Sequence, residues 1–389
     1  MKITLVTEVF PPKAGGAGWS TRALALALKA AGHEVIVVTT AEGPTNAGPV
    51  PVVRLTGSDG RFRRGAMVET FRKALSESSF GPEVIHAQHS LSALGALSLE
   101  AGPRTVVTVR DHWPVCFWST RMSRKALCPQ CSTGGMWRCI DGRLPKLSAP
   151  AAIPYMKWDL ADKQKALRKA SAVVAVSQSI ASELRAVSIG GVHVLPNIVD
   201  ADEVNSLAVA SPTIPLPSRF VLFVGKLEAN KGATDLIPAL VRSKVQLPLV
   251  VLGSGSEEKK IRSVAEKHGI ELIMPGWADR DDVVRATKRA EALIFPSTWP
   301  EPLSRVLLEA LALGTPIAAM DTGGTSELIE NNRSGLLARN VDELGDALGR
   351  IVHDGSMRSR LIDGAKARAA AFAPEALIPK YEAVYRGDR

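Results

Sequence analysis

The chain has no apolar run of the roughly eighteen residues that a membrane-spanning helix needs. It also lacks a signal-peptide pattern at its start, because MKITLVTEVFPP has one lysine, a short alternating apolar run and a Pro-Pro stop. A content of 46% hydrophobic and 22% charged residues is typical of a globular protein. We therefore expect a cytoplasmic protein, and its 389 residues are too many for one ordinary core, which predicts two domains.

The full dinucleotide-binding fingerprint is also missing. Gly15, Gly16 and Gly18 follow a predicted strand at Ile3–Thr7 and precede a predicted helix from about Trp19 to Ala31. They do not have the spacing of three glycines and a later acid that a nicotinamide site requires. Glycines at a helix start still allow the backbone to approach a phosphate or a sugar.

Strands and helices alternate along both halves of the chain, which predicts an α/β fold with doubly wound parallel sheets. A Pro-rich segment at 208–218 reads as the linker, and a second alternating series begins at Arg219. The strands expected in the first series are 34–39, 52–55, 84–87, 105–109 and 172–176, and those in the second include 220–224, 291–295 and 316–320.

The stretch from Phe295 to Glu327 follows one of these strands at its predicted carboxyl end, where ligands bind in open α/β sheets. Pro302 suits the first turn of a helix in which Glu309 lies. Glu301 and Glu309 are separated by seven residues, which on a helix means a rise of about 12 Å, so they cannot share a proton. A second strand then leads into Gly323, Gly324 and Glu327, and this turn suits a phosphate.

This order of residues resembles the retaining glycosyltransferases of family 4, whose signature is a glutamate pair separated by seven residues and a later Gly-Gly-x-x-Glu. The resemblance implies the GT-B fold, in which two Rossmann-like domains face each other across a cleft. It predicts an acceptor-binding domain at 1–205, a nucleotide-sugar-binding domain at 218–374, and a last helix at 375–389 that packs back on the first domain. Pro196, Asn197 and Asp200 match the turn that ends the family's first domain.

Gly225, Lys226 and Lys231 follow the first strand of the second series, and lysines beside glycines at a strand end suit a diphosphate. In the resembling family this motif holds the nucleotide diphosphate. The resemblance further implies that Glu309 binds the ribose and that Glu301 faces the donor sugar with the backbone near Leu303 and Ser304. The other donor-binding residues that it implies are Gly15, Gly16, Gly253, Gly255, Trp277, Gly323, Gly324 and Glu327. The family needs no metal for catalysis, and the chain has no DxD motif.

Family members often carry a His-Asp pair after the strand at 105–109. Here Arg110 stands in the place of the histidine, and His112 follows Asp111. Which of Arg110 and His112 meets the donor sugar or the acceptor stays open. All three residues are candidates for the catalytic site.

Cysteine is scarce, and the four cysteines all lie within the segment 111–150. Cys116, Cys128, Cys131 and Cys139 suit a four-thiolate zinc site, and a metal would hold together a long loop. Free thiols and an iron–sulfur or redox role are the alternatives. We expect a structural zinc ion and no catalytic cofactor.

The net charge of +9 is uneven, because residues 1–200 have a balance of +10 and residues 201–389 of −1. Lys163, Lys165, Arg168 and Lys169 form a basic cluster that suits an anionic membrane surface or an anionic acceptor, or is only a solvated face. We expect a UDP- or GDP-linked sugar as donor, a glycan or lipid-linked acceptor, and peripheral contact with the inner membrane face. The alternatives are a nucleotide-sugar epimerase of the same fold and a zinc-containing nucleic-acid binder. The latter leaves the donor motifs unexplained, so no nucleic acid is expected.

Overall fold

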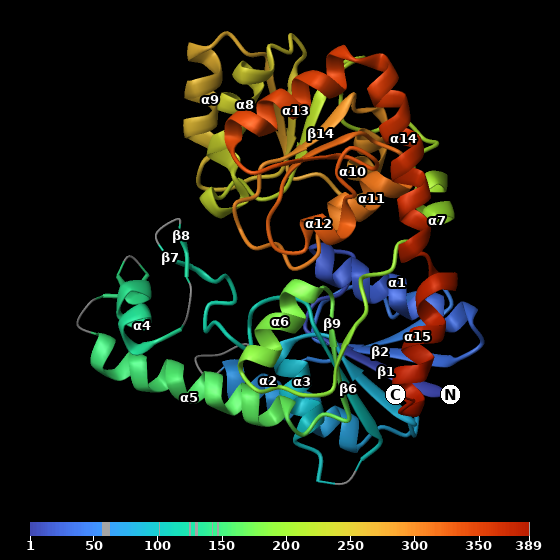
Figure 1. Cartoon of the computed structure of the whole chain (residues 1–389). Helices are drawn as coiled ribbons and strands as arrows, with labels where there is room; N and C mark the ends of the chain where they lie inside the picture. The colour runs from blue at the N-terminus through green and yellow to red at the C-terminus, as the bar shows by residue number, and fades with distance from the viewer. Residues whose placement is uncertain are drawn as a thin grey trace. The chain divides into compact units, whose positions relative to one another are not determined.

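The computed structural model describes residues 1–56, 63–100, 102–123, 126–128, 131–141, 143–145 and 148–388. The chain forms two compact units (Figure 1). The first consists of Met1–Ile198 with Pro374–Arg389, and the second of Val199–Ala373. No helix in the described part of the chain combines the length and the apolar character that crossing a membrane requires.

The first unit has an eight-stranded sheet in the order β10-β9-β6-β5-β1-β2-β4-β3, parallel except for the β3/β4 pair. Its strands are buried Val- and Ile-rich runs, as expected for a parallel sheet covered by helices. The strands are β1 (Lys2–Thr7), β2 (Glu34–Thr39), β3 (Asn46–Ala47), β4 (Val50–Arg54), β5 (Val84–Ala87), β6 (Arg104–Val109), β9 (Ala172–Ala175) and β10 (Val192–Val194), and β7 (Met122–Ser123) and β8 (Ala126–Leu127) form a separate hairpin.

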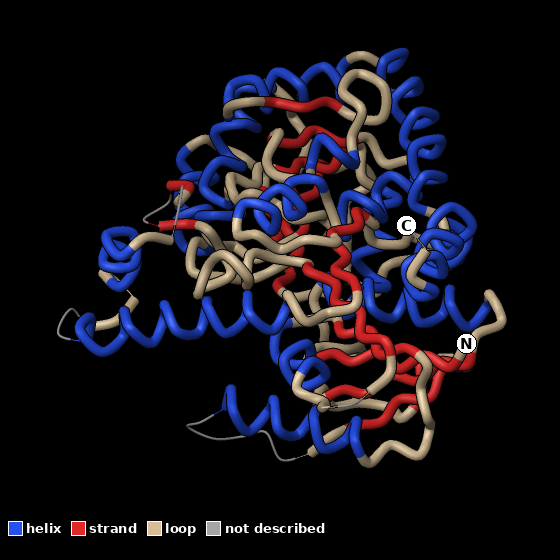
Figure 2. The backbone as a smooth tube through the Cα atoms, turned by 60° about the horizontal axis from the view of Figure 1, so that its bottom comes forward, coloured by secondary structure: helices blue, strands red, loops and turns tan. Residues whose placement is uncertain are grey.

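Helices connect these strands, and Figure 2 shows them around the sheet. They are α1 (Gly16–Ala30), α2 (Arg63–Ser76), α3 (Ser90–Leu97), α4 (Thr133–Ile140), α5 (Ala149–Leu167), α6 (Gln178–Ala186) and the last helix α15 (Pro374–Arg386). Helix α15 belongs to the first unit, because Leu377, Ile378 and Tyr381 share a core with Leu24 and Ile3. The N-terminus lies near this helix, because His33 is 3.3 Å from the terminal amino group and 2.9 Å from Glu382 on α15.

The second unit has a parallel six-stranded sheet in the order β13-β12-β11-β14-β15-β16. Its strands are β11 (Val221–Val224), β12 (Leu249–Leu252), β13 (Leu272–Gly276), β14 (Ala292–Phe295), β15 (Ile317–Met320) and β16 (Leu336–Ala338). Its helices are α7 (Ala201–Leu207), α8 (Leu236–Ser243), α9 (Glu258–Lys267), α10 (Arg280–Arg289), α11 (Arg305–Leu313), α12 (Thr325–Leu328), α13 (Val341–His353) and α14 (Gly355–Ala369), with 3-10 turns at Ala229–Lys231, Ala233–Asp235 and Ala370–Phe372.

The boundary between the units differs from the predicted one. The first unit ends at Ile198 and not at residue 205, because helix α7 packs on α10 and α11. Asp200 fixes the start of α7, since its carboxylate accepts the backbone N–H groups of Asp202 and Glu203 at 3.0 Å each.

Both sheets are doubly wound and have a point at which the order of strands reverses. In the second sheet this point lies between β11 and β14, which are parallel neighbours. In the first it lies between β1 and β5. The carboxyl ends of these strand pairs are where a doubly wound sheet binds its ligands.

Candidate functional site

The loops after β11 and β14 meet through an ion pair. Nζ of Lys231 lies 2.6 Å from Oε1 of Glu301, although the two residues are 70 positions apart. The hydroxyl of Ser297 donates to the same carboxylate oxygen at 2.7 Å, and the ammonium group lies 3.9 Å from the ring centre of Trp299. Glu301 is only 4% exposed. Lys231, predicted to bind the diphosphate, and Glu301, predicted to face the sugar, are therefore in direct contact at the point where the strand order reverses.

The Gly-Gly turn after β15 holds the backbone of Glu301 in place. The N–H of Gly324 donates to the carbonyl of Glu301 at 2.6 Å. Gly323 has φ +56°, and a Cβ there would lie 2.3 Å from the same carbonyl oxygen. Only glycine fits such a conformation at such a distance. The turn thus explains why a Gly-Gly pair accompanies the first glutamate.

Three other glycines bring the loop after β11 close to its neighbours, two of them to the loop after β12 and one to the loop after β14. A Cβ on Gly253 would lie 1.9 Å from the carbonyl oxygen of Gly225, and one on Gly255 would lie 2.4 Å from that of Leu227. A Cβ on Gly232, beside Lys231, would lie 1.8 Å from the carbonyl oxygen of Pro296. These backbones touch directly, because a glycine has no side chain to keep them apart.

Two predicted residues at this edge are exposed. The side chain of Lys226 is 68% exposed, and its Nζ lies 3.9 Å from a carboxylate oxygen of Glu228. Trp277, which follows β13, is also 68% exposed. Both are accessible to a ligand bound at the sheet edge.

Glu309 is held by two arginines that the sequence did not single out. Its Oε1 accepts from Nε of Arg305 at 3.0 Å and from Nε of Arg280 at 3.1 Å, and Arg280 also donates to Glu203 at 3.2 Å. Burial alone would lower the pKa of Arg280, but the two carboxylates outweigh it and raise that pKa. Burial lowers the pKa of Arg305. This arrangement fixes the orientation of the Glu309 carboxylate.

Helix α11 begins later than predicted. Ser304 is its N-cap, with a side-chain oxygen 3.5 Å from the N–H of Leu307, so the helix starts at Arg305 and Pro302 lies in the loop before it. Leu303 is buried beside it. Glu327 lies in the short helix α12, where its backbone carbonyl accepts from Arg368 at 2.6 Å.

In the first unit, the residues at the end of β6 turn to different partners. The guanidinium of Arg110 is buried and donates to Asn197 and Gln88. His112 is fully buried, with Nδ1 2.7 Å from Glu183 on α6. Arg110 thus lies directly at the end of β6, whereas His112 is turned toward α6, and their catalytic roles stay predictions.

Asp111 and an unpredicted acid, Glu8, lie near the reversal point of the first sheet. The carboxylate of Asp111 accepts the N–H of Trp113 at 2.8 Å, and burial raises its pKa. Glu8 follows β1 and accepts the N–H of Ser92 at 2.6 Å. Burial raises the pKa of Glu8 to about 7. No described group donates a hydrogen bond to its second oxygen, and Nδ1 of His89 lies 3.7 Å from that atom.

Gly15 and Gly16 form the start of α1 in the first unit. Gly15 is the N-cap, and a Cβ there would meet nothing within 4 Å, so the space beside this helix start is open. Gly15 and Gly16 lie between β1 and α1, where the sequence predicted a glycine turn at a helix start. Their predicted contact with the donor stays a prediction.

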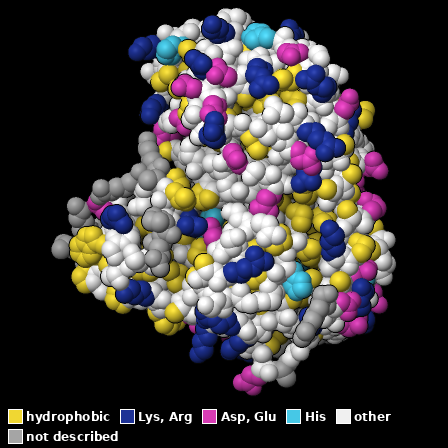
Figure 3. Space-filling model, viewed as in Figure 1, with side chains coloured by type: hydrophobic (Ala, Val, Ile, Leu, Met, Phe, Trp, Pro, Cys, Tyr) yellow, Lys and Arg dark blue, Asp and Glu magenta, His cyan; other side chains and the backbone are white. Residues whose placement is uncertain are grey.

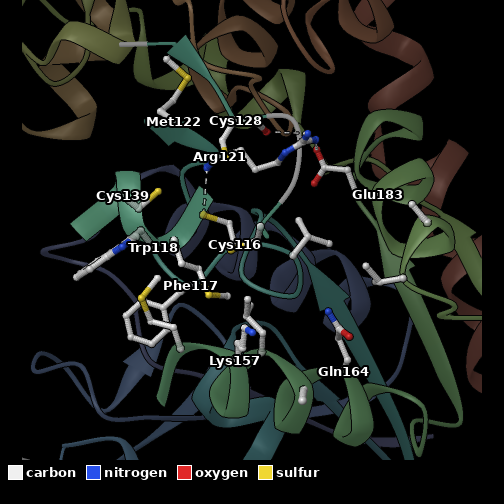
Figure 4. A pocket seen from close by; sticks show the side chains of 18 residues that line it. Cys116, Phe117, Trp118, Arg121, Met122, Cys128, Cys139, Lys157, Gln164 and Glu183 are labelled. Atoms are coloured by element: carbon white, nitrogen blue, oxygen red, sulfur yellow. Dashed lines mark hydrogen bonds and ion pairs between the residues drawn. The ribbon is translucent and has the colours of Figure 1, made fainter. Parts of the chain in front are cut away.

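The four cysteines line one cavity of about 470 Å³ in the first unit (Figure 4). Phe117, Trp118 and Glu183 are also in its lining, and none of the cysteines is in a disulfide. Burial and the neighbouring thiols raise the pKa of Cys131 to about 11. Among the described residues, no group of three or more His, Cys, Asp or Glu side chains is placed so that it holds a metal ion. The predicted zinc is thus not confirmed.

Comparisons with known proteins cover almost the whole chain. Residues 14–203 match Glycosyltransferase Family 4, and residues 208–368 match the family described as Glycosyl transferases group 1. Glycogen synthase of Mycobacterium tuberculosis is 25% identical over 430 residues, which cover 100% of this chain and 96% of that protein. D-inositol 3-phosphate glycosyltransferase of Corynebacterium jeikeium is 32% identical over 198 residues, 45% of this chain and 47% of the relative.

A similar solved structure is HepE of Anabaena in complex with UDP-glucose. It has a TM-score of 0.70 and 19% identity, and the match covers 98% of both chains. At this identity the likeness concerns the fold, which has two Rossmann-like domains.

Proposed function

The chain belongs to the group 1 and family 4 glycosyltransferases with the GT-B fold, and from this premise we propose that it transfers a sugar from a UDP- or GDP-linked donor to an acceptor with retention at the anomeric carbon. The observation that carries the proposal is the pair of Lys231 and Glu301 at the point where the strand order of the second sheet reverses. Two charged groups that are predicted to touch the diphosphate and the sugar lie there in direct contact.

The donor diphosphate is assigned to Lys226, Lys231 and the glycine turns. An ammonium group has three N–H donors, so Lys231 can bind a phosphate oxygen while it keeps its bond to Glu301. Gly225, Gly253 and Gly255 have no side chains of their own, so their backbone can approach a phosphate closely. Preorganised charge of this kind stabilises the leaving diphosphate in the transition state, and no metal is needed for this role.

Glu309 is assigned to the ribose hydroxyls. Both arginine Nε atoms bind its Oε1 and orient the carboxylate, whose oxygens have lone pairs to accept hydrogen bonds from hydroxyl groups. Glu301, with the backbone near Leu303 and Ser304, is assigned to the donor sugar. These two roles are assigned from the partners of each glutamate, since Glu301 pairs with Lys231 at the diphosphate site and Glu309 pairs with arginines instead.

The acceptor is assigned to the first unit, at the carboxyl edge of its sheet. Glu8, Arg110 and Asp111 lie at this edge beside the strand-order reversal. Residues 1–200 carry a balance of +10, which favours an acceptor that bears phosphate, such as a lipid-linked glycan precursor.

Proton NMR of nucleotide sugars incubated with the protein tests this function. A true donor is slowly cleaved even without its acceptor, and retention requires that the sugar released first has the anomeric configuration of the donor. Release of the opposite anomer contradicts retention. Conversion of one nucleotide sugar into another without release of nucleotide would instead indicate an epimerase.

A further inference from the structure

One segment of the first unit holds most of the excess positive charge of the chain. We call residues 117–167 the arm, which includes α4 and α5. The arm has nine Lys and Arg against three Asp, a balance of +6 out of +9 in about 13% of the chain. Figures 1 and 2 show α4 and the adjoining end of α5 projecting from the sheet of this unit.

The arm also has a large share of the exposed apolar side chains. Ten large hydrophobic side chains are exposed among the described residues, and five of them lie in the arm: Leu127, Trp137, Leu144, Tyr155 and Trp158, at 55%, 54%, 37%, 47% and 52%. An even distribution would put about one in a segment of this length. Single exposed apolar residues are ordinary, but such a concentration marks an interaction surface.

Two of these rings belong to an aromatic row. Trp118 contacts Phe117 with ring centres 5.0 Å apart, Phe117 contacts Tyr155 at 5.8 Å, and Tyr155 contacts Trp158 at 5.6 Å. The inner rings, Phe117 and Trp118, line the cysteine cavity (Figure 4). The row therefore supports Tyr155 and Trp158 from within and fixes them at the surface.

Both acids of α5 pair with basic residues of the same unit. Asp159 lies 2.7 Å from Lys163 and 2.9 Å from Arg64, and Asp162 also pairs with Arg64. Lys163 is only 7% exposed, so the predicted basic cluster loses it from the surface. Among the described residues of the arm, the charged residues that are classed as exposed are Arg138, Arg143, Lys157 and Lys165, and all four are basic.

We propose that the arm binds the surface of an anionic lipid bilayer. Trp and Tyr favour the headgroup level of a membrane, and each lysine or arginine near an anionic surface adds attraction. Exposed Leu127 and Leu144 suit the acyl boundary, whereas a nucleic acid offers them no apolar partner. Hydrophobic and basic side chains lie near each other on the projecting part in Figure 3. The inference goes beyond the proposed transfer reaction and does not rest on the donor site.

Co-sedimentation of the full chain with vesicles tests the proposal. The chain should bind vesicles of phosphatidylglycerol and phosphatidylcholine more tightly than vesicles of phosphatidylcholine alone, and added salt should weaken this binding. Lys157→Glu with Lys165→Glu should lower the affinity at least tenfold, because each of the two charges is worth about fivefold. The matched control is Lys259→Glu with Lys260→Glu, an exposed pair on α9 that should change little.

The apolar contribution is tested with Trp137→Ala, alone and combined with Trp158→Ala. Each variant should have a lower affinity for vesicles. Trp137→Ala is also tested alone because Trp158 contacts Arg64, and the single change on α4 leaves that contact intact. Val241→Ser on the second unit is the control for an exposed apolar residue. Thermal unfolding should stay unchanged in Trp137→Ala and in the lysine variants, and nucleotide binding should stay unchanged in all variants. Equal binding to both kinds of vesicle, or arm variants that bind like the wild type, would overturn the proposal. Binding to single-stranded DNA is measured in parallel. Arm variants that lose DNA binding but still bind vesicles like the wild type would also overturn the proposal.

Discussion

Lys231 and Glu301 form an ion pair of 2.6 Å that joins the loops after β11 and β14. The side chain of Glu301 is 5% exposed and that of Lys231 is 24% exposed, so the pair is largely withdrawn from water. Glu301 therefore depends on Lys231 as its counter-charge. Any change at Lys231 affects both the diphosphate site and the carboxylate that faces the sugar.

Lys231→Ala should lower stability and turnover, whereas Lys226→Ala should lower turnover alone. Removal of Lys231 leaves a buried carboxylate without its cation, which costs about 2–4 kcal/mol of unfolding free energy. Lys226 is exposed, so its loss should change stability by less than about 0.5 kcal/mol. Each change should reduce kcat/KM about 10²- to 10³-fold. Urea unfolding and donor cleavage measure the two effects. Wild-type turnover in both variants would show that the diphosphate site lies elsewhere.

Gly323→Ala should destabilise the second unit by about 3 kcal/mol or more. The added Cβ would meet the carbonyl of Glu301 at 2.3 Å, in a backbone conformation with φ +56°. Gly355→Ala is the matched control, since Gly355 begins α14 with nothing within 4 Å of a new Cβ. Thermal unfolding should separate the two variants clearly. Equal melting temperatures would contradict the close contact.

Glu8→Gln should stabilise the protein at high pH only. The pKa of Glu8 is about 7 in the folded chain against an ordinary 4.5. Between these values the folded chain keeps a proton that the unfolded chain has lost, so the free energy of unfolding falls as pH rises through this window. The charged form thus costs up to about 3 kcal/mol above pH 7, which the glutamine avoids. Unfolding of both proteins should give equal stability near pH 4.5 and a more stable variant at pH 8. A difference that does not change with pH would rule out this titration.

Protein purified without added metal should contain about one zinc ion per chain. Four thiols line one cavity, and binding of a cation would offset the raised pKa values of Cys131 and Cys139 by stabilising their thiolates. The thiols would have to move closer together to bind zinc, since no group of three or more described His, Cys, Asp or Glu side chains is arranged to hold a metal ion. Elemental analysis of the wild type and of Cys128→Ser with Cys131→Ser measures the content. Zinc far below one per chain, with four titratable thiols, would assign the cysteines to the cavity lining alone.

The sequence predicted the family, the GT-B fold and the doubly wound sheets correctly, because buried strands and glycine turns are local signals. The strands 34–39 and 84–87 were predicted with their observed bounds. The start of α11 was wrong by three residues, since Ser304 caps the helix and Pro302 does not begin it. The assigned roles of the donor residues stay predictions.

The side-chain partners could not be predicted, because they join distant positions. Nothing local in the sequence connects Arg280 with Glu309 or Glu8 with Ser92. Two partners had a usable signal: Arg305 precedes Glu309 by four residues on one helix face, and Asp159 precedes Lys163 in the same way. The second signal would have shown that Lys163 is paired rather than exposed.

Calorimetric titration with UDP, GDP and ADP tests most directly whether the second unit binds the donor nucleotide through these residues. We predict that one of the three binds the wild type at micromolar concentrations. Glu309→Gln should lower the affinity for that nucleotide at least tenfold, because a carboxylate accepts hydrogen bonds from hydroxyl groups more strongly than an amide does. Glu301→Gln should bind it within about threefold of the wild type but lose turnover. Failure of all three nucleotides to bind at millimolar concentration, or equal losses of affinity in both variants, would contradict the account.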